Sequence, residues 1–241
     1  MSLDRRKLEN AWARWRAGLP PRGPVVSPEV PNDLFQAHRS FYAFAARFAE
    51  GRDVLDLGCG TGYGTADLAA AGAARTVGID PDERLLSYAR RRYCAPSLEF
   101  RAGHAERLPD DLGSFGLIAA GNALPHMEDP DAALGGAAAL LASGGIVLAS
   151  VPPILDGQTL ARHKAQPSHR SNRYLWEWEE TFRRHFHALR LFRCLPPPGI
   201  HPDFSSPAAS RLSPTDFSYE EIPLADLDDV GGLAAVFLAT S

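Results

Sequence analysis

An apolar stripe with helical spacing runs along the N-terminal part of the chain. Four residues at intervals of three and four positions form it: Leu8, Trp12, Trp15 and Leu19. This spacing predicts a helix over residues 3–19 with one apolar face. A second helical pattern covers residues 32–48, where Asn32 or Asp33 can cap the N-terminus. Residues 20–31, between the two patterns, are rich in proline and glycine and are expected to form a loop.

Short apolar runs alternate with helical patterns in the next hundred residues. Five runs are predicted to be buried strands: VLDL at 54–57, RTVGI at 75–79, LEFRA at 98–102, FGLIAA at 115–120 and GIVLASV at 145–151. Helices are expected to begin near Tyr63, Asp82 and Asp131. Strands that alternate with helices predict a parallel sheet covered on both faces, which is the doubly wound α/β architecture.

The alternation stops after Pro152. Residues 153–173 are polar and are expected to be irregular, and residues 195–215 form a long Pro/Ser-rich loop; both are predicted to cover the domain. A helix is expected over residues 175–185. Two further strands, HALRLFR at 187–193 and LAAVFLAT at 233–240, complete a predicted set of seven.

Composition narrows the class of protein. The 241-residue chain is 45% hydrophobic with a formal net charge of −4, so it has no general attraction to nucleic acid or to an anionic membrane. Its three cysteines are scattered, which argues against a disulfide framework or a zinc site and fits a reducing cytoplasm. The charged N-terminus does not resemble a signal peptide, and no apolar run is long enough for a membrane span. A soluble, cytoplasmic protein without a metal is expected.

The most informative stretch is VLDLGCGTGYG, in which Gly58, Gly60 and Gly62 connect a buried strand to a helix. Glycine permits backbone conformations that a Cβ forbids, and a helix N-terminus offers unpaired N–H groups to a carboxylate or phosphate. The turn lies at the carboxyl end of a strand, where doubly wound sheets bind ligands. A dinucleotide-binding G-x-G-x-x-G would need glycine in place of Tyr63 or Thr65, so a nicotinamide oxidoreductase is disfavoured.

From Gly51 to Pro152 the sequence resembles the class I S-adenosylmethionine (SAM)-dependent methyltransferases. Four segments after the glycine turn carry the resemblance in the family's order: GIDPDERLLSYAR, AGHAERLP, FGLIAAGNALPHMEDP and LLASGGIVLASVP. The resemblance implies a Rossmann-like, seven-stranded, mostly parallel sheet with an antiparallel last strand. It implies SAM as the cofactor, a helical lid over residues 1–50 and a SAM-binding domain over residues 51–241.

The same resemblance implies which residues contact the cofactor. Asp80, at the end of the second predicted strand, is expected to bind the two ribose hydroxyls, a task suited to two carboxylate oxygens. The implied set is Asp56, Gly58, Cys59, Gly60, Gly62, Asp80, Pro81, His104, Ala105 and Asn122. The sequence departs from the family at His104, where an acid or small polar residue is usual, at Gly116, which replaces an acid, and at Pro125. A neutral imidazole at position 104 can still accept one hydrogen bond.

Methyl transfer from a sulfonium requires alignment of the nucleophile and exclusion of water, and a hydroxyl acceptor also benefits from a base. His126, just past the fourth strand, is the candidate base; alternatively it shapes the loop through a backbone hydrogen bond. Asn122 contacts cofactor or substrate, or caps the turn. Six basic side chains follow the fifth strand and either hold a phosphate or carboxylate or form a solvated loop: Arg162, His163, Lys164, His169, Arg170 and Arg173.

A finer resemblance involves the helix before the glycine turn. His38, Phe41, Tyr42 and Phe44 match methyltransferases associated with glycan and surface-polysaccharide genes, in which this helix folds over the cofactor. This favours O-methylation of a sugar or another secondary-metabolite hydroxyl. N-methylation of a small metabolite and a catalytically silent SAM-binding protein remain alternatives. A small-molecule acceptor is the expected partner, a homodimer is left open, and nucleic acid is disfavoured because no N/D-P-P-Y-type motif follows the fourth strand.

Overall fold

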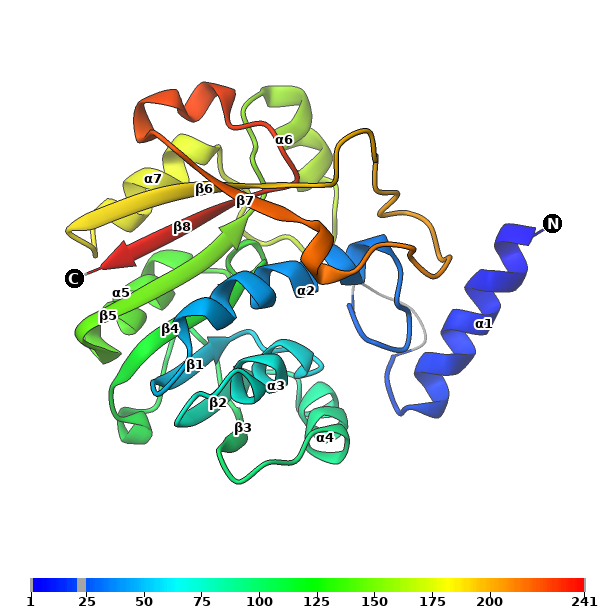
Figure 1. The fold of residues 1–241 in the computed structure, drawn as a ribbon, viewed down its shortest axis with the longest axis horizontal. Coiled ribbons are helices and arrows are strands. Elements are labelled where there is room, and N and C mark those ends of the chain that lie inside the picture. The colour runs from blue at the N-terminus through cyan, green and yellow to red at the C-terminus, as the bar shows by residue number, and fades with distance from the viewer. Residues whose placement is uncertain (1, 21–24, 241) are drawn as a thin grey trace.

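A single mixed sheet organises the computed structural model, which describes residues 2–20 and 25–240 (Figure 1). Within the described residues the sheet has eight strands in the order β3-β2-β1-β4-β5-β8-β6-β7. Their bounds are β1 Asp53–Leu57, β2 Arg75–Asp80, β3 Leu98–Ala102, β4 Phe115–Gly121, β5 Leu141–Val151, β6 Ala188–Leu195, β7 Ser218–Ile222 and β8 Ala234–Thr240. Strands β1 to β5 pair in parallel, and β8 runs antiparallel to β5.

Helices cover both faces of this sheet. Their bounds are α1 Ser2–Arg16, α2 Asp33–Ala45, α3 Tyr63–Ala70, α4 Glu83–Arg92, α5 Pro130–Leu140, α6 Gly157–Lys164 and α7 Leu175–Arg183. Short 3-10 turns lie at Ala46–Phe48, Asp110–Leu112, Leu124–His126, Pro214–Asp216 and Leu224–Asp229. Helices α2, α3 and α4 lie on the near face in Figure 1, and α5 and α7 lie on the far face. The doubly wound, mostly parallel fold predicted from the sequence is confirmed.

The period-two alternation of the strands divides the core between the two faces. In β1, Val54 packs with α2 and α3, whereas Leu55 and Leu57 pack with the residues of α5 and α7. On the far face Trp178 and Phe182 of α7 are fully buried. Both faces of a parallel sheet must be covered in this way, so its strands are apolar throughout.

The predicted strand count of seven was wrong, because β7 adds an eighth strand at the edge of the sheet. Its sequence, SYEEI, carries no apolar alternation that would identify a strand. Glu221 and Glu220 instead pair with Arg190 and Arg193 of β6, at 2.5 and 2.9 Å. Opposite charges on neighbouring strands stabilise an exposed edge that has little hydrophobic burial.

The predicted irregular segment 153–173 also differs from the structure, because it contains α6. Asp156 caps this helix by accepting hydrogen bonds from the backbone N–H groups of Gln158 and Thr159. The sequence of α6, GQTLARHK, has only Leu160 and Ala161 as apolar side chains, so the helix has no apolar stripe by which it could be predicted.

The two N-terminal helices are placed differently. Helix α2 begins after Asn32, whose side chain accepts from the Phe35 N–H, and it buries Phe35, Phe41 and Phe44 against the sheet. Helix α1 lies at one end of the molecule, away from the sheet (Figure 1). Residues 25–31 between the helices are irregular as expected, and positions 21–24 of the predicted loop lie outside the described residues. Among the described helices, none is long and apolar enough to cross a membrane.

Candidate functional site

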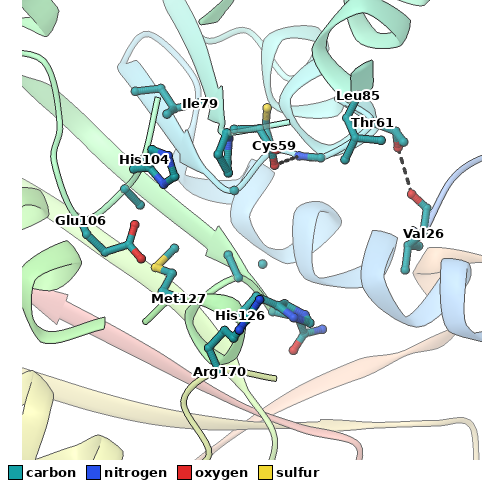
Figure 2. A pocket seen from close by; sticks show the side chains of 18 of the residues that line it. Val26, Cys59, Thr61, Ile79, Leu85, His104, Glu106, His126, Met127 and Arg170 are labelled. Atoms are coloured by element: carbon teal, nitrogen blue, oxygen red, sulfur yellow. Dashed lines mark hydrogen bonds between the residues drawn. The ribbon is translucent and has the colours of Figure 1, made fainter. Parts of the chain in front are cut away.

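A cavity of about 710 Å³ opens at the carboxyl ends of the central strands (Figure 2). The glycine turn, the ends of β2 and β4, and the segments that follow β3 and β4 line it. Its size lies within the usual range for small-molecule and cofactor sites. In Figure 2, His104 and Glu106 lie on one side of the cavity, and His126 and Arg170 lie together on another.

The glycine turn forms the floor of the cavity. Gly58 and Gly60 have φ angles of +71° and +54°, in the left-handed region that disfavours residues with a Cβ. A Cβ on Gly58 would lie 2.7 Å from the Ala123 Cβ, whereas a Cβ on Gly60 would meet nothing within 4 Å. Because Gly60 lines the cavity, its bare backbone is open to a ligand. The turn therefore fits a cofactor that lies close to the main chain.

Asp80 is positioned at the end of β2 and lines the cavity. One carboxylate oxygen accepts the Gly60 N–H and the other accepts the Asp82 N–H, both at 2.9 Å. Burial raises the pKa of Asp80, and these two backbone hydrogen bonds oppose the rise. Each oxygen keeps a lone pair for a hydroxyl group. The carboxylate is thus held in place and suited to a pair of ribose hydroxyls.

Asp56 lies beneath the turn and outside the cavity lining, although it was predicted to contact the cofactor. It is fully buried, and its oxygens accept the hydroxyl groups of Tyr42 and Thr65 at 3.1 and 2.7 Å. Burial raises the pKa of Asp56 to about 7, against the effect of these two donors. The geometry gives Asp56 a supporting position that ties α2 and α3 to the glycine turn.

Gly62 is the second predicted contact that the structure places outside the lining. It has a φ of +79°, and a Cβ there would lie within 2.8 Å of Ala89 of α4 and of Phe100 of β3. Glycine is therefore required at this position for close packing and for the left-handed backbone, whether or not a ligand is present.

Asn122 follows β4 with a φ of +52°, in the left-handed region although it is not glycine. Its N–H donates to the Ser150 Oγ at 2.8 Å, and its Nδ2 lies 3.3 Å from His38 Nε2. Since an amide nitrogen can only donate, His38 Nε2 accepts and the imidazole is neutral. Burial, and secondarily the nearby His126, lower the pKa of His38 to about 4, which keeps it neutral.

His126 lines the same part of the cavity and has a defined tautomer. Its Nδ1 lies 2.8 Å from the Ser168 carbonyl oxygen, so Nδ1 carries a proton and Nε2 keeps its lone pair when the ring is neutral. The His169 ring packs edge-on against it, with centroids 5.0 Å apart. Arg170 donates its backbone N–H to the Pro125 carbonyl oxygen at 2.8 Å, which fixes its segment to the His126 loop.

Most of the predicted cofactor and base residues therefore lie together around one cavity. Those that line it are Gly58, Cys59, Gly60, Asp80, Pro81, His104, Ala105, Asn122 and His126. Of the six basic residues that follow the fifth predicted strand, Arg170 lines the cavity and the other five do not.

Several lining residues were not predicted as contacts. They include Val25, Val26, Thr61, Leu85, Glu106 and Met127. Thr61, Leu85, Glu106 and Met127 lie inside the segments that carry the family resemblance, so they could have been included in the predicted set. Val25 and Val26 could not, because a long-range hydrogen bond from Thr61 Oγ1 to the Val26 carbonyl oxygen, at 3.0 Å, places them there.

A glycine turn at the end of β1 and an acid at the end of β2, both facing one cavity, define a Rossmann-like cofactor-binding domain. Residues 54–145 match the family model described as a methyltransferase domain. A Mycolicibacterium smegmatis protein named "Probable S-adenosylmethionine-dependent methyltransferase" is 36% identical over 138 residues, which are 56% of this chain and 52% of that protein. The chain thus spans about half the length of this curated relative.

Two further similarities involve proteins that are named for quite different acceptors. A tRNA U34 carboxymethyltransferase of Alcanivorax borkumensis is 41% identical over 103 residues, covering 41% of this chain and 32% of that protein. The solved structure of a magnesium protoporphyrin IX methyltransferase from Synechocystis, with bound SAH, superposes with a TM-score of 0.59 at 16% identity. That superposition covers 97% of this chain and 96% of the other, and it shows a shared fold.

Residues 54–145 form a methyltransferase domain of the class I SAM-dependent type, as the sequence predicted, and SAM is the cofactor of that class. The open backbone at Gly60 and the held carboxylate of Asp80 fit this cofactor.

Proposed function

We propose that this protein transfers the methyl group of SAM to a hydroxyl group of a small molecule. The observation that carries the proposal is the continuity of the cavity, which extends from the glycine turn and Asp80 to Asn122 and His126. One cavity can therefore receive both a cofactor and an acceptor. When bound, SAM supplies an activated methyl group, and the protein has to align the acceptor and exclude water.

His126 is proposed to take the proton of the acceptor hydroxyl. Its Nδ1–H is held by the Ser168 carbonyl oxygen, so the free lone pair on Nε2 is the basic atom. The neutral His38 and the amide of Asn122 line the same region and can orient the hydroxyl by hydrogen bonds. The same three side chains could also receive an amine, and for this reason N-methylation is the neighbouring possibility.

Arg170 is proposed to bind an anionic group on the acceptor, such as the phosphate of a nucleotide-linked sugar or a carboxylate. The guanidinium lines the cavity beside His126 (Figure 2). Its planar donors suit bidentate recognition of carboxylate and phosphate oxygens. A cavity of about 710 Å³ that also has to hold the cofactor favours a small acceptor over a nucleic acid, despite the relative named for tRNA.

Cofactor binding is tested by calorimetric titration of SAM and S-adenosylhomocysteine into the wild type, Asp80→Asn and Asp111→Asn. Asp111 is exposed and pairs with Arg101 outside the cavity, so it is a matched control. Asp80→Asn replaces one carboxylate oxygen by an amide nitrogen, and the loss of one hydrogen bond to a charged group costs about 1.5–3 kcal/mol, so binding should weaken by roughly ten- to a hundredfold. Equal affinity of the two variants would remove Asp80 from the cofactor site.

Methyl transfer is tested by measuring S-adenosylhomocysteine release with a panel of sugars, nucleotide sugars and phenols, and with tRNA. His126→Gln should lower kcat by about a hundredfold or more on the preferred acceptor, whereas His187→Gln, at an exposed position outside the cavity, should not. Tight SAM binding without turnover on any acceptor would support the silent binding protein instead. Turnover on tRNA alone would overturn the small-molecule acceptor.

A further inference from the structure

Helix α1 contacts the rest of the protein through its polar side. The Asn10 side chain donates to the Pro207 carbonyl oxygen at 2.8 Å, and the Arg14 guanidinium donates to the Val25 carbonyl oxygen at 2.6 Å. These two residues are one helical turn apart and share a face. The face that contacts the protein is therefore the hydrophilic one.

The apolar stripe of α1 points to solvent instead. Leu8, Trp12 and Trp15 are 67%, 58% and 66% exposed, and they lie on the face of the helix opposite to Asn10 and Arg14. Helices of globular proteins normally direct such a stripe toward the core. Figure 1 shows α1 at one end of the molecule with no other helix or strand beyond it. The stripe is thus an exposed apolar surface that no other described element covers, and such a surface marks a site of interaction.

The charge of α1 differs from that of the rest of the chain. Ser2–Arg16 contains five basic residues (Arg5, Arg6, Lys7, Arg14 and Arg16) and two acids (Asp4 and Glu9), a net charge of +3. The whole chain has −4, so the remainder carries −7. The Arg16 guanidinium lies 4.6 Å above the Trp12 ring, next to the stripe. The partner should therefore be apolar below its surface and negatively charged at its surface.

We propose that α1 binds an anionic lipid surface, with Leu8, Trp12 and Trp15 inserted at the boundary of the acyl chains. Tryptophan and leucine on one face and arginine and lysine around them are typical of helices that lie in the membrane interface. Trp side chains prefer this depth because they are apolar with one polar group. The inference concerns attachment and is independent of the reaction proposed above.

The size of the stripe favours a lipid surface over a second copy of the chain. Three side chains of this kind expose about 400 Å² at the observed fractions, whereas a stable protein interface buries about 800 Å² on each partner. Interfacial helices need no such area, since electrostatic attraction to anionic lipids adds to apolar burial. A nucleic acid would use the arginines but would give no reason for the apolar side chains to be on the outer face.

The test uses the full chain and two kinds of vesicle: phosphatidylcholine alone, and phosphatidylcholine mixed with phosphatidylglycerol. We expect co-sedimentation with the anionic vesicles, a blue shift of tryptophan fluorescence, and weaker binding at high salt. The double variant Trp12→Ala/Trp15→Ala should bind at least tenfold more weakly. Trp176→Ala is the matched control, because Trp176 is 50% exposed on α7, and it should bind like the wild type.

Thermal unfolding of the double variant should match that of the wild type, which shows that a loss of binding is not a loss of folding. Sedimentation velocity without vesicles and titration with tRNA complete the experiment. The proposal is overturned if neither vesicle is bound. It is also overturned if the double variant dissociates a dimer of the wild type, or if tRNA is bound and anionic vesicles are not.

Discussion

The two N-terminal helices have similar apolar periodicity but opposite environments. Helix α2 buries Phe41 and Phe44 against the sheet and lines the cavity with His38 and Tyr42. Helix α1 directs its tryptophans to solvent and contacts the rest of the protein through polar side chains, and none of its described side chains lines the cavity. A periodic stripe therefore indicates that a helix has an apolar face, and it leaves open which surface covers that face. The prediction that residues 1–50 act together as a lid stays a prediction, and α2 is the part that borders the cavity.

The largest expected contrast between the two helices concerns stability. Phe41→Ala removes a ring that is 2% exposed and should lower the free energy of unfolding by about 3–5 kcal/mol. Trp12→Ala removes a larger ring that is 58% exposed and should change it by less than about 0.5 kcal/mol. Urea unfolding followed by circular dichroism measures both. A comparable loss in Trp12→Ala would mean that α1 packs its stripe in solution.

The second contrast is in pH dependence, because α2 holds His38, a half-buried titratable residue with a lowered pKa. The folded pKa of His38 is about 4 against an ordinary 6.5, so the unfolded chain binds a proton between these values and the folded one does not. The contribution of His38 to the free energy of unfolding is therefore complete above pH 6.5 and is lost as the pH falls toward 4. Asp56 acts in the opposite direction: its folded pKa is about 7 against an ordinary 3.8, so its contribution decreases as the pH rises between these values.

The two effects oppose each other in the wild type, and single variants separate them. Between about pH 4 and 6.5, the difference in free energy of unfolding between His38→Gln and the wild type should become more unfavourable to the variant as the pH rises. The difference between Asp56→Asn and the wild type should change in favour of the variant. Each slope should be at most about 1.4 kcal/mol per pH unit. Chemical denaturation at a series of pH values gives the difference curves, with His187→Gln as an exposed control. Parallel curves for all variants would show that neither residue has a shifted pKa.

The smallest expected effect is on cofactor affinity when α1 is removed. Deletion of residues 1–16 should leave the Kd for S-adenosylhomocysteine within about twofold of the wild type, because the cavity lining includes none of the α1 side chains that the structure describes. Calorimetry measures this directly. A tenfold weaker Kd would show that α1 contributes to the cover of the site and that α1 and α2 act together in cofactor binding.

The features that the sequence predicted well are those that a short stretch of residues determines by itself. The Gly58 and Gly60 backbone is left-handed, neither position leaves room or conformation for an ordinary side chain beside a ligand, and the turn could therefore be located without any structure. Asp80 was predicted from the family resemblance, and the structure places it at the carboxyl end of β2 in the cavity lining. Both predictions depend on residues close together in sequence.

The parts that were not predicted depend on contacts between distant residues. Strand β7 is stabilised by charge pairs between Glu221 and Arg190 and between Glu220 and Arg193, which a polar pentapeptide does not reveal. Asp56 matches the family pattern, yet its carboxylate is occupied by Tyr42 and Thr65, and only the packing of α2 and α3 determines this. The acceptor remains outside the reach of local sequence for the same reason.

The close fit of Tyr42 has a consequence for how ligands enter and leave. A Cβ on Gly64 would lie 2.2 Å from the Tyr42 ring, and one on Gly121 would lie 3.0 Å from it. Helix α2 therefore packs directly against the backbone at these two glycines. The segment at Val26, by contrast, is attached to the glycine turn by the Thr61 hydroxyl (Figure 2). The residence time of the spent cofactor, and with it the upper limit on turnover, is therefore expected to be set by the release of this segment.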